Sequence, residues 1–336
     1  ERPGPETASV GATLELLGLN QFDQGNLEAA VPLLEESLEI QRRALGEPHP
    51  DVATALNNLA FVLYRRGDYS RAEALFRDVL AMQRQLLGLE HPELATALGN
   101  IAIVLQDKGD LVAAEGTLRE AIAMQRRLYS GPHPDLARSL NNLAFLLNEN
   151  GDVGGAIEQG RAALDMNRAI YGEKHPAVAQ SLSSLGRLTR LAGNLDESER
   201  LFRRALELRE ELLGSEHPDT AWSMTALADV LEASGDYEEG RKLAVAAREV
   251  FNATLPADHW RNAVAMSVEG ACLAGLERFP EGHPLIVNSV TALQANPGAT
   301  PDLVRDALKR TIAFYERWQR PEEASKYRTR LAQLAT

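Results

Sequence analysis

The stretch HPDVATALNNLAFVLYRRGDYSRAEALF, residues 49–76, decides the fold. It contains two apolar runs joined by the pair Gly67-Asp68. The apolar residues recur every three or four positions: Val52, Leu56, Leu59 and Leu63 in the first run, and Ala72, Leu75, Phe76, Val79 and Leu80 in the second and just after it. Because this spacing places side chains on one face of an α-helix, the stretch predicts two helices separated by a tight turn.

The same pattern recurs through the whole chain at intervals of 42 residues. His-Pro pairs begin at His49, His91, His133, His175 and His217, and His259 keeps the interval without the proline. Gly-Asp or Gly-Asn pairs begin at Gly25, Gly67, Gly109, Gly151, Gly193 and Gly235. Small residues form a third series, at Ala30, Ala72, Ala114, Ala156, Ser198, Gly240, Gly282 and Ala324. Eight intervals of 42 account for all 336 residues, so we predict an array of eight helix pairs.

The His-Pro pairs are predicted to start the first helix of each pair. Pro50 suits the first turn of a helix, and Asp51 places negative charge at the positive end of the helix dipole. The alternative is that the histidines form a metal cluster. Helix layers spaced by roughly 10 Å cannot bring equivalent histidines to one metal, whose bonds are about 2.0–2.1 Å long. We therefore expect each histidine to cap the following helix or to bond the preceding turn, and His283, which lies outside the series, has no candidate partner.

The small residues are predicted to lie where the two helices of a pair cross. Helices pack at roughly 8–10 Å, and a small side chain lets the two backbones approach. A matching series on the first helices runs through Gly18, Ala60, Ala102, Ala144, Gly186, Ala228 and Gly270, and it breaks at Ile312.

These residues resemble the tetratricopeptide repeat (TPR): Leu59-Ala60, Gly67-Asp68-Tyr69, Ala72 and Phe76 match its motif. The interval of 42, with Leu-Gly before His-Pro and Leu-Asn-Asn-Leu-Ala after it, resembles the longer repeat of kinesin light chain. The resemblance implies an all-α, right-handed α-solenoid of about eight 42-residue helix–turn–helix repeats, in which the first helices line a concave groove. It covers nearly the whole chain, but it does not indicate the biological role.

We expect one solenoid domain over residues 1–336. Residues 1–5 are predicted to be a frayed tail, residues 6–294 to form repeats 1 to 7, and residues 301–334 to form a C-terminal capping helix pair. The segment FYERWQRPEEASKYRTRL, residues 314–331, also resembles the C-terminal repeats attached to bacterial Ser/Thr protein kinases. The chain begins with Glu1 rather than Met, so we expect it to be processed or cut from a longer protein.

Composition narrows the range of partners. The net charge of −13 argues against nucleic acid and against an anionic membrane surface, and no run of 18 apolar residues predicts a membrane span. We find no signal peptide. Cys272 is the only cysteine, which excludes disulfides within the chain and thiolate zinc sites. We expect a cytoplasmic protein of undetermined oligomeric state.

No catalytic motif occurs in the chain. G-x-S-x-G, H-E-x-x-H, G-x-x-x-x-G-K and G-x-G-x-x-G are all absent, and GDVGG at residues 151–155 is interpreted as a variant of the turn between helices. Cys272, between Gly270 and Leu273 on an apolar helix, is interpreted as a small core residue rather than a nucleophile. We therefore expect no enzyme activity, no cofactor and no metal.

Repeated asparagines on the first helices are the strongest candidate for a binding site. Asn is a poor helix former, yet Asn58, Asn100 and Asn142 occupy one position in three successive repeats. Their amides donate and accept hydrogen bonds together, which suits the backbone of an extended peptide. The resemblance points the same way, because asparagine at this position commonly holds peptide backbone. The alternative, that these amides bond the neighbouring helix, stays open, and it is favoured for the flanking Asn57 and Asn141.

Other residues are predicted to complete this groove. Apolar pockets are expected at Phe61, Ile103 and Phe145, with Tyr64 beside them. Arg187 and Arg190 are expected either to bind an acidic side chain or a C-terminal carboxylate of the ligand, or to be ordinary exposed arginines.

These observations predict a scaffold that binds a peptide or protein segment in its groove and catalyses no reaction. The alternative is a regulatory or substrate-recruiting region of a larger bacterial signalling enzyme, such as a Ser/Thr kinase or a protease. A third hypothesis, a consensus-like array without a ligand, is disfavoured because the groove residues differ between repeats.

Overall fold

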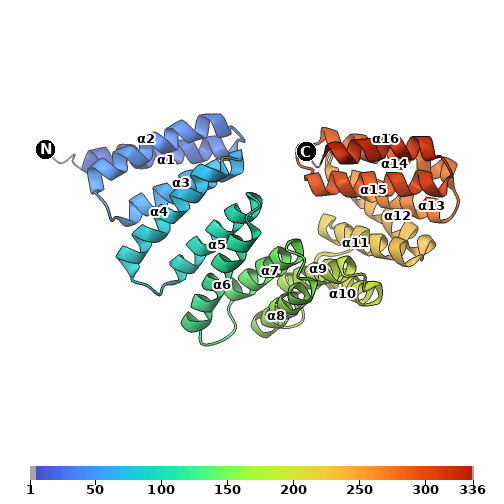
Figure 1. The fold of residues 1–336 in the computed structure, drawn as a ribbon, viewed down its shortest axis with the longest axis horizontal. Helices are drawn as coiled ribbons and strands as arrows, with labels where there is room; N and C mark the ends of the chain where they lie inside the picture. Colours follow the sequence, from blue (N-terminus) through green and yellow to red (C-terminus); the bar gives the residue numbers. More distant parts are fainter. Residues whose placement is uncertain (1–4, 335–336) are drawn as a thin grey trace. The chain divides into compact units, whose positions relative to one another are not determined.

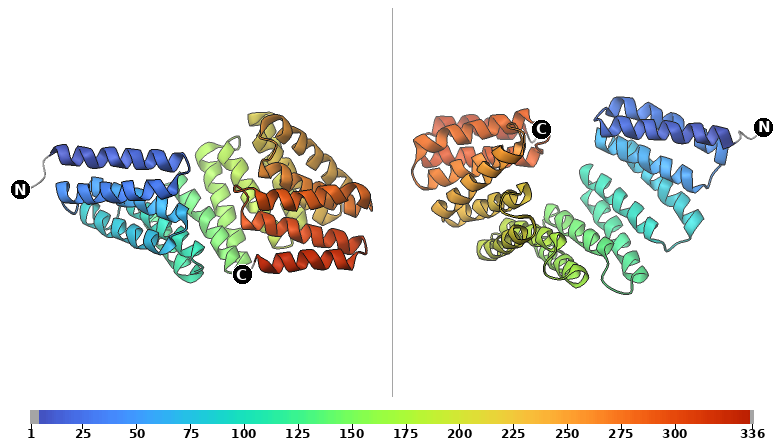
Figure 2. Two further views of the ribbon diagram at one scale, coloured as in Figure 1. Left: turned by 90° about the horizontal axis from the view of Figure 1, so that it is seen from above. Right: turned by 180° about the vertical axis from the view of Figure 1, so that it is seen from behind.

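The computed structural model describes residues 5–334, with side chains from residue 8 onward, and this range contains sixteen α-helices and no β-strand. The helices are α1 (Pro5–Asp23), α2 (Leu27–Leu45), α3 (Pro50–Arg66), α4 (Tyr69–Leu87), α5 (Pro92–Asp107), α6 (Leu111–Leu128), α7 (Pro134–Glu149), α8 (Val153–Tyr171), α9 (Pro176–Leu191), α10 (Leu195–Leu213), α11 (Pro218–Ser234), α12 (Tyr237–Thr254), α13 (Trp260–Gly275), α14 (Phe279–Ala295), α15 (Pro301–Arg317) and α16 (Pro321–Gln333). Consecutive helices lie side by side as antiparallel pairs (Figures 1 and 2). The predicted α-solenoid of eight helix pairs is confirmed.

The chain packs as two compact units, and the division falls after Met166, within α8. The first unit contains α1 to α7, in which each helix packs on the next along the chain. The second unit contains α9 to α16, and there α11 also packs directly on α13, and α13 on α15. The predicted single domain over residues 1–336 stays a prediction. Of the predicted frayed tail, residues 1–4 lie outside the described residues, and Pro5 begins α1.

Histidine starts the first helix of six pairs. In α3 the ring nitrogen Nδ1 of His49 accepts a hydrogen bond from the backbone N–H of Asp51 at 3.1 Å, as expected of an N-cap residue. The same bond is made by His91, His133, His175, His217 and His259. The predicted capping role of the histidine series is confirmed.

A glycine ends the first helix of each of the first six pairs, and the next residue is placed to start the second. Gly67 has a φ of 88°, in the left-handed region that favours glycine, and the side chain of Asp68 then accepts a hydrogen bond from the N–H of Arg71. In the last two pairs Glu277 and Gln319 occupy the glycine position, with φ of 59° and 56°. These two residues adopt a backbone conformation that costs a side-chain-bearing residue energy.

The small residues lie where the paired helices cross. Ala60 and Ala72 are fully buried. A Cβ added to Gly18 would lie 2.8 Å from the Cγ atom of Leu34, closer than real contacts allow. A Cβ on Gly240 would likewise lie 3.1 Å from the carbonyl oxygen of Ala228, itself a member of the first-helix series. Both small series therefore confirm the close helix crossing predicted from their spacing.

An aromatic cluster packs the end of α15 against α14 and α16. Phe279 of α14 stacks on Trp318 with ring centroids 5.6 Å apart, and Tyr315 stacks on Tyr327 of α16 at the same distance. The hydroxyl of Tyr315 is 3.0 Å from Nε2 of His283. The expectation that His283 has no partner is wrong, because the partner lies 32 residues away on a different pair.

Candidate functional site

Seven predicted groove residues lie on the first helices of the first unit, and we call them the Asn face. They are Asn58, Phe61 and Tyr64 on α3, Asn100 and Ile103 on α5, and Asn142 and Phe145 on α7. Because they repeat at the same register positions, each position can be compared between successive repeats.

Two of the three asparagines bond the preceding first helix. The Nδ2 atom of Asn58 donates to Oε1 of Glu15 on α1 at 2.7 Å. The Nδ2 atom of Asn100 lies 3.5 Å from Oδ1 of Asn57 on α3, in the same geometry one repeat later, because Glu15 and Asn57 are register equivalents. These contacts correspond to the alternative left open for the asparagines, a bond between neighbouring helices.

Asn142 differs from the other two. The register equivalent of Asn57 in the preceding repeat is Gly99, which has no side chain to accept a hydrogen bond, and a Cβ placed there would meet nothing within 4 Å. Among residues 8–334 the half-buried amide of Asn142 has no hydrogen-bond partner. The Asn face therefore contains one amide whose donor and acceptor are both open.

Apolar side chains accompany the asparagines. Phe61 is 42% exposed and packs edge-on against Phe22 of α1, with ring centroids 5.5 Å apart. Ile103 is 36% exposed, and Phe145 is half-buried. An isoleucine exposed to this degree on a helix whose neighbouring positions are buried offers an apolar contact for a ligand.

Tyr64 contributes to packing between repeats. Burial, together with a hydrogen bond to Asp107 on α5, raises the pKa of Tyr64 to about 12. Its ring also lies 5.9 Å from that of Tyr69. The hydroxyl is therefore engaged with the next repeat, although the residue as a whole is only half-buried.

The two predicted groove arginines lie on α9 in the second unit. Arg187 is exposed, whereas the guanidinium of Arg190 forms an ion pair with Asp229 of α11 at 2.9 Å. Arg310 of α15 reaches the same carboxylate at 2.5 Å. Burial by itself would raise the pKa of Asp229, but the two guanidiniums outweigh it and hold that pKa below its usual range. The role of Arg187 and Arg190 in ligand binding stays a prediction.

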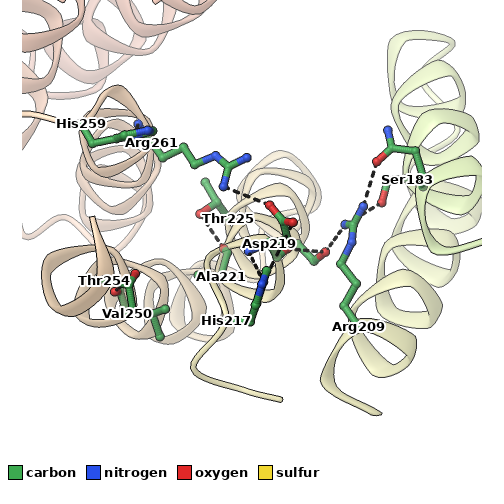
Figure 3. Close-up of polar contacts among 12 residues, drawn as sticks. Ser183, Arg209, His217, Asp219, Ala221, Thr225, Val250, Thr254, His259 and Arg261 are labelled. Atoms are coloured by element: carbon green, nitrogen blue, oxygen red, sulfur yellow. Dashed lines mark hydrogen bonds and ion pairs between the residues drawn. The ribbon is translucent and has the colours of Figure 1, made fainter. Parts of the chain in front are cut away.

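A residue that the sequence interpretation did not select lines a hollow in the second unit. The hollow has a volume of about 330 Å³ and lies between α9, α10 and α11, lined by Pro176, Ala177, Gln180, Arg209, Leu212, Leu213 and Asp219. Figure 3 shows Arg209 reaching from α10 toward Ser183 of α9. The available signal was the register series Gln41, Gln83, Gln125 and Asn167, in which the next member, Arg209, replaces an amide with a cation.

In the range 5–334 no group of three or more His, Cys, Asp or Glu side chains is placed to hold a metal ion. Cys272 is fully buried, and this burial raises the pKa of its thiol, so its interpretation as a core residue is confirmed. In the same part of the chain no helix combines the length and apolar character required to cross a bilayer.

Several solved structures share this fold. The nearly identical TPR-like repeats of a Podosopora anserina kinesin light chain are 24% identical, with 62% of this chain and 98% of that chain covered and a TM-score of 0.55. BtubC (BKLC) from P. vanneervenii is also 24% identical, covering 68% of this chain and 91% of that chain, with a TM-score of 0.60. The quorum sensor NprR from B. thuringiensis is 13% identical, covering 98% and 88%, with a TM-score of 0.69. No curated protein matches the chain.

A family model that matches the sequence agrees with this structural similarity. The model, described as Tetratricopeptide repeat, matches five overlapping segments: 9–85, 51–127, 93–168, 135–211 and 185–253. Together they span more than half of the chain, in register with its helix pairs. The chain therefore belongs to the tetratricopeptide-repeat family.

Proposed function

We propose that the chain binds an extended peptide or protein segment along the Asn face of its first unit and catalyses no reaction of its own. Membership of the tetratricopeptide-repeat family supports the coarser statement, that the chain is a protein-interaction scaffold. The proposal includes a cytoplasmic location.

The open amide of Asn142 is the observation that carries the proposal. An extended peptide presents backbone N–H and C=O groups at regular intervals, and one asparagine amide satisfies one of each. The register of the Asn100–Asn57 contact pairs Asn142 with Gly99, where the missing side chain leaves room for such a strand. Ile103, one helical turn beyond Gly99, offers an apolar contact for a ligand side chain.

Asn58 has a supporting role in this proposal. Its Nδ2 atom is held by Glu15, which in turn accepts a hydrogen bond from Gln41 at 2.8 Å. This network fixes the orientation of the Asn58 amide and leaves its oxygen to accept from a ligand N–H. Asn58 is therefore a preorganised acceptor, and preorganisation reduces the entropy lost on binding.

The proposal predicts that peptide binding is weakened both by removing the amide of residue 142 and by adding an amide at residue 99. Asn142→Ala removes the open amide, and Gly99→Asn supplies the hydrogen-bond acceptor that Asn57 provides to Asn100. Peptides selected from a displayed random library against the unaltered chain should bind each variant about tenfold more weakly, as expected for the loss of one hydrogen bond. Fluorescence anisotropy with the selected peptides measures this loss.

The matched control is Gly116→Asn. Gly116 lies on the second helix α6, and a Cβ there also meets nothing within 4 Å, so the same substitution is made away from the Asn face. This variant should bind like the unaltered chain. Equal affinities for all variants, or a library from which no peptide is selected, contradict the proposal.

A second candidate function is substrate recruitment within a larger bacterial signalling enzyme. The observation that favours it is the resemblance of residues 314–331 to repeats attached to bacterial Ser/Thr protein kinases. A kinase or protease domain encoded in the same reading frame supports this candidate, and an open reading frame restricted to the present chain rules it out.

A further inference from the structure

Arg209 is a buried guanidinium whose partners are all neutral. Its exposed fraction is 9%. It donates from Nη1 to the hydroxyls of Ser183, at 3.1 Å, and Ser223, and from Nη2 to the side-chain oxygen of Gln180 at 3.0 Å. Among residues 8–334 no carboxylate forms an ion pair with it. Three of the five guanidinium N–H groups therefore donate hydrogen bonds within the chain, and two remain to donate to a ligand.

The charges around Arg209 do not balance. Asp219, the carboxylate that lines the same hollow, is paired with a second guanidinium, Arg261 of α13, at 3.1 Å (Figure 3). The one carboxylate of the lining is therefore already paired with Arg261 and not with Arg209. Burial disfavours the charged form of Arg209 and lowers its pKa, so the guanidinium is held there at an energetic cost. One further anion would compensate the excess positive charge.

The equivalent hollow of the first repeat contains a carboxylate from the chain itself. It is lined by Ala8, Ala12, Glu15, Gln41, Leu45, Asp51 and Thr54, and there Gln41 donates to the carboxylate of Glu15 at 2.8 Å. The register equivalent of Gln41 in the fifth repeat is Arg209, and that of Glu15 is Ser183. Compared with the first repeat, the fifth therefore has a cation in place of the amide and a hydroxyl in place of the carboxylate that the amide bonds.

The other residues that line the hollow indicate what kind of group would accompany a bound anion. Leu212 and Leu213, 37% and 39% exposed, form an apolar side, together with Pro176 and Ala177 at the start of α9. A hollow of about 330 Å³ suits an acidic group and one apolar side chain, since ligand pockets begin at about this size. Guanidinium recognises carboxylate through parallel N–H···O bonds.

We propose that the Arg209 hollow binds one carboxylate of a partner, flanked by an apolar side chain. The carboxylate comes from an Asp or Glu side chain or from a C-terminus. That its natural source is a peptide rests on the proposed function. The binding of a carboxylate in the hollow depends only on the residues described above.

Short probes test the hollow without a known partner. Three are titrated into the isotope-labelled full chain: N-acetyl-Leu-Asp amide, N-acetyl-Leu-Leu with a free carboxylate, and the neutral N-acetyl-Leu-Asn amide. We expect saturable shifts of the backbone amides of Ala177 and Gln180 with one or both acids, and at least tenfold weaker binding of the neutral probe. Which acid binds identifies the source of the carboxylate.

Two variants complete the test. Arg209→Gln places the amide of the earlier repeats in the hollow and should reduce binding of the acids at least tenfold. Arg204→Gln removes a positive charge from an exposed position of the same helix, where Arg204 pairs with Glu207, and should leave binding unchanged. Circular dichroism confirms that both variants fold, and Arg209→Leu replaces Arg209→Gln if the latter does not.

Each outcome supports or overturns the binding of a carboxylate in the Arg209 hollow, whatever the library peptides do at the Asn face. Binding of acids that survives loss of Arg209, or the absence of binding to the unaltered chain, overturns the inference. Acid binding that depends on Arg209 supports it, even where no library peptide binds the Asn face.

Discussion

At the scale of single residues, the repeated histidines have a structural role that their spacing predicted. Each is an N-cap whose Nδ1 atom accepts a backbone N–H, and this bond requires an imidazole without a proton on that nitrogen. The role was predictable because a cap depends only on residues within one helical turn.

Substitution of a capping histidine tests this role. His91→Ala should lower the free energy of unfolding by about 1 kcal/mol, because the N–H of Glu93 loses its acceptor. His91→Ser should retain most of that stability, since serine is also a favoured N-cap residue. Thermal unfolding followed by circular dichroism measures both. A serine variant as unstable as the alanine variant contradicts the capping role.

The glycine position at the turn gives a second test at this scale. Glu277 has a positive φ where earlier repeats have glycine, so Glu277→Gly should raise the free energy of unfolding by roughly 0.5–1 kcal/mol. The reverse change, Gly235→Ala, forces alanine to a φ of 94° and should destabilise by at least as much. Midpoints of thermal unfolding should move in opposite directions, and a shared direction contradicts the strain argument.

Arg209 and Asn142 show what residue patterns could not predict. Arg209 meets a serine, Ser183 of the same repeat, where the first repeat has the carboxylate of Glu15, and Asn142 follows a repeat that has Gly99 in place of a side chain. The register identifies equivalent residues, but which equivalents touch depends on how adjacent first helices cross. The asparagines were identified from sequence, whereas the difference between Asn142 and the other two required the structure.

At the scale of helices, an ion-pair cluster links three first helices of the second unit. Asp229 of α11 lies between Arg190 of α9 and Arg310 of α15, which is 81 residues further along the chain than Asp229. Glu232, also on α11, has its pKa raised by burial and by Asp229. This contact across two repeats stabilises the unit beyond nearest-neighbour packing, and the 42-residue pattern gave no sign of it.

Asp229→Asn tests this cluster. It removes the one carboxylate that forms ion pairs with both Arg190 and Arg310, and it should cost about 3 kcal/mol at neutral pH. Glu239→Gln, which breaks the exposed pair with Arg203, should cost less than about 1 kcal/mol. Chemical denaturation of the two variants and the unaltered chain measures the difference, and equal losses contradict a structural role for the cluster.

The pH dependence of the same variant has a defined sign. The pKa of Asp229 is lower in the folded chain than in the unfolded chain, where it is about 4. The ionised carboxylate therefore contributes fully to the free energy of unfolding above about pH 4, and this contribution is lost as the pH falls through the lower pKa of the folded chain. The difference in unfolding midpoint between the unaltered chain and Asp229→Asn should stay level from pH 7 to pH 5 and shrink below about pH 4. A difference that already disappears by pH 5 contradicts the depressed pKa.

At the scale of the whole molecule, the sequence predicted the number and the pairing of the helices almost completely. It could do so because each repeat is built from local signals: a cap, a proline, a glycine turn and two small residues at the crossing. The last repeat departs from this pattern at Ile312 and Gln319, yet the small residue Ala324 and an aromatic cluster maintain the pair.

The same local signals also explain why the sequence does not identify the function. Tetratricopeptide repeats share their structural positions and differ in the residues that face a ligand, so the family supports a scaffold without identifying its partner. The Asn face and the Arg209 hollow are two places where this chain departs from its own register, and within the described residues each keeps polar groups that are free to bond a ligand.

The most direct test of the account is a map of where a bound peptide touches the chain. A library-selected peptide is titrated into the isotope-labelled chain, and the backbone amide shifts are followed by nuclear magnetic resonance. Binding along the Asn face should give the largest shifts at Gly99, Ile103 and Asn142, on the first helices α5 and α7. Shifts confined to the second helices α4 and α6 would contradict it.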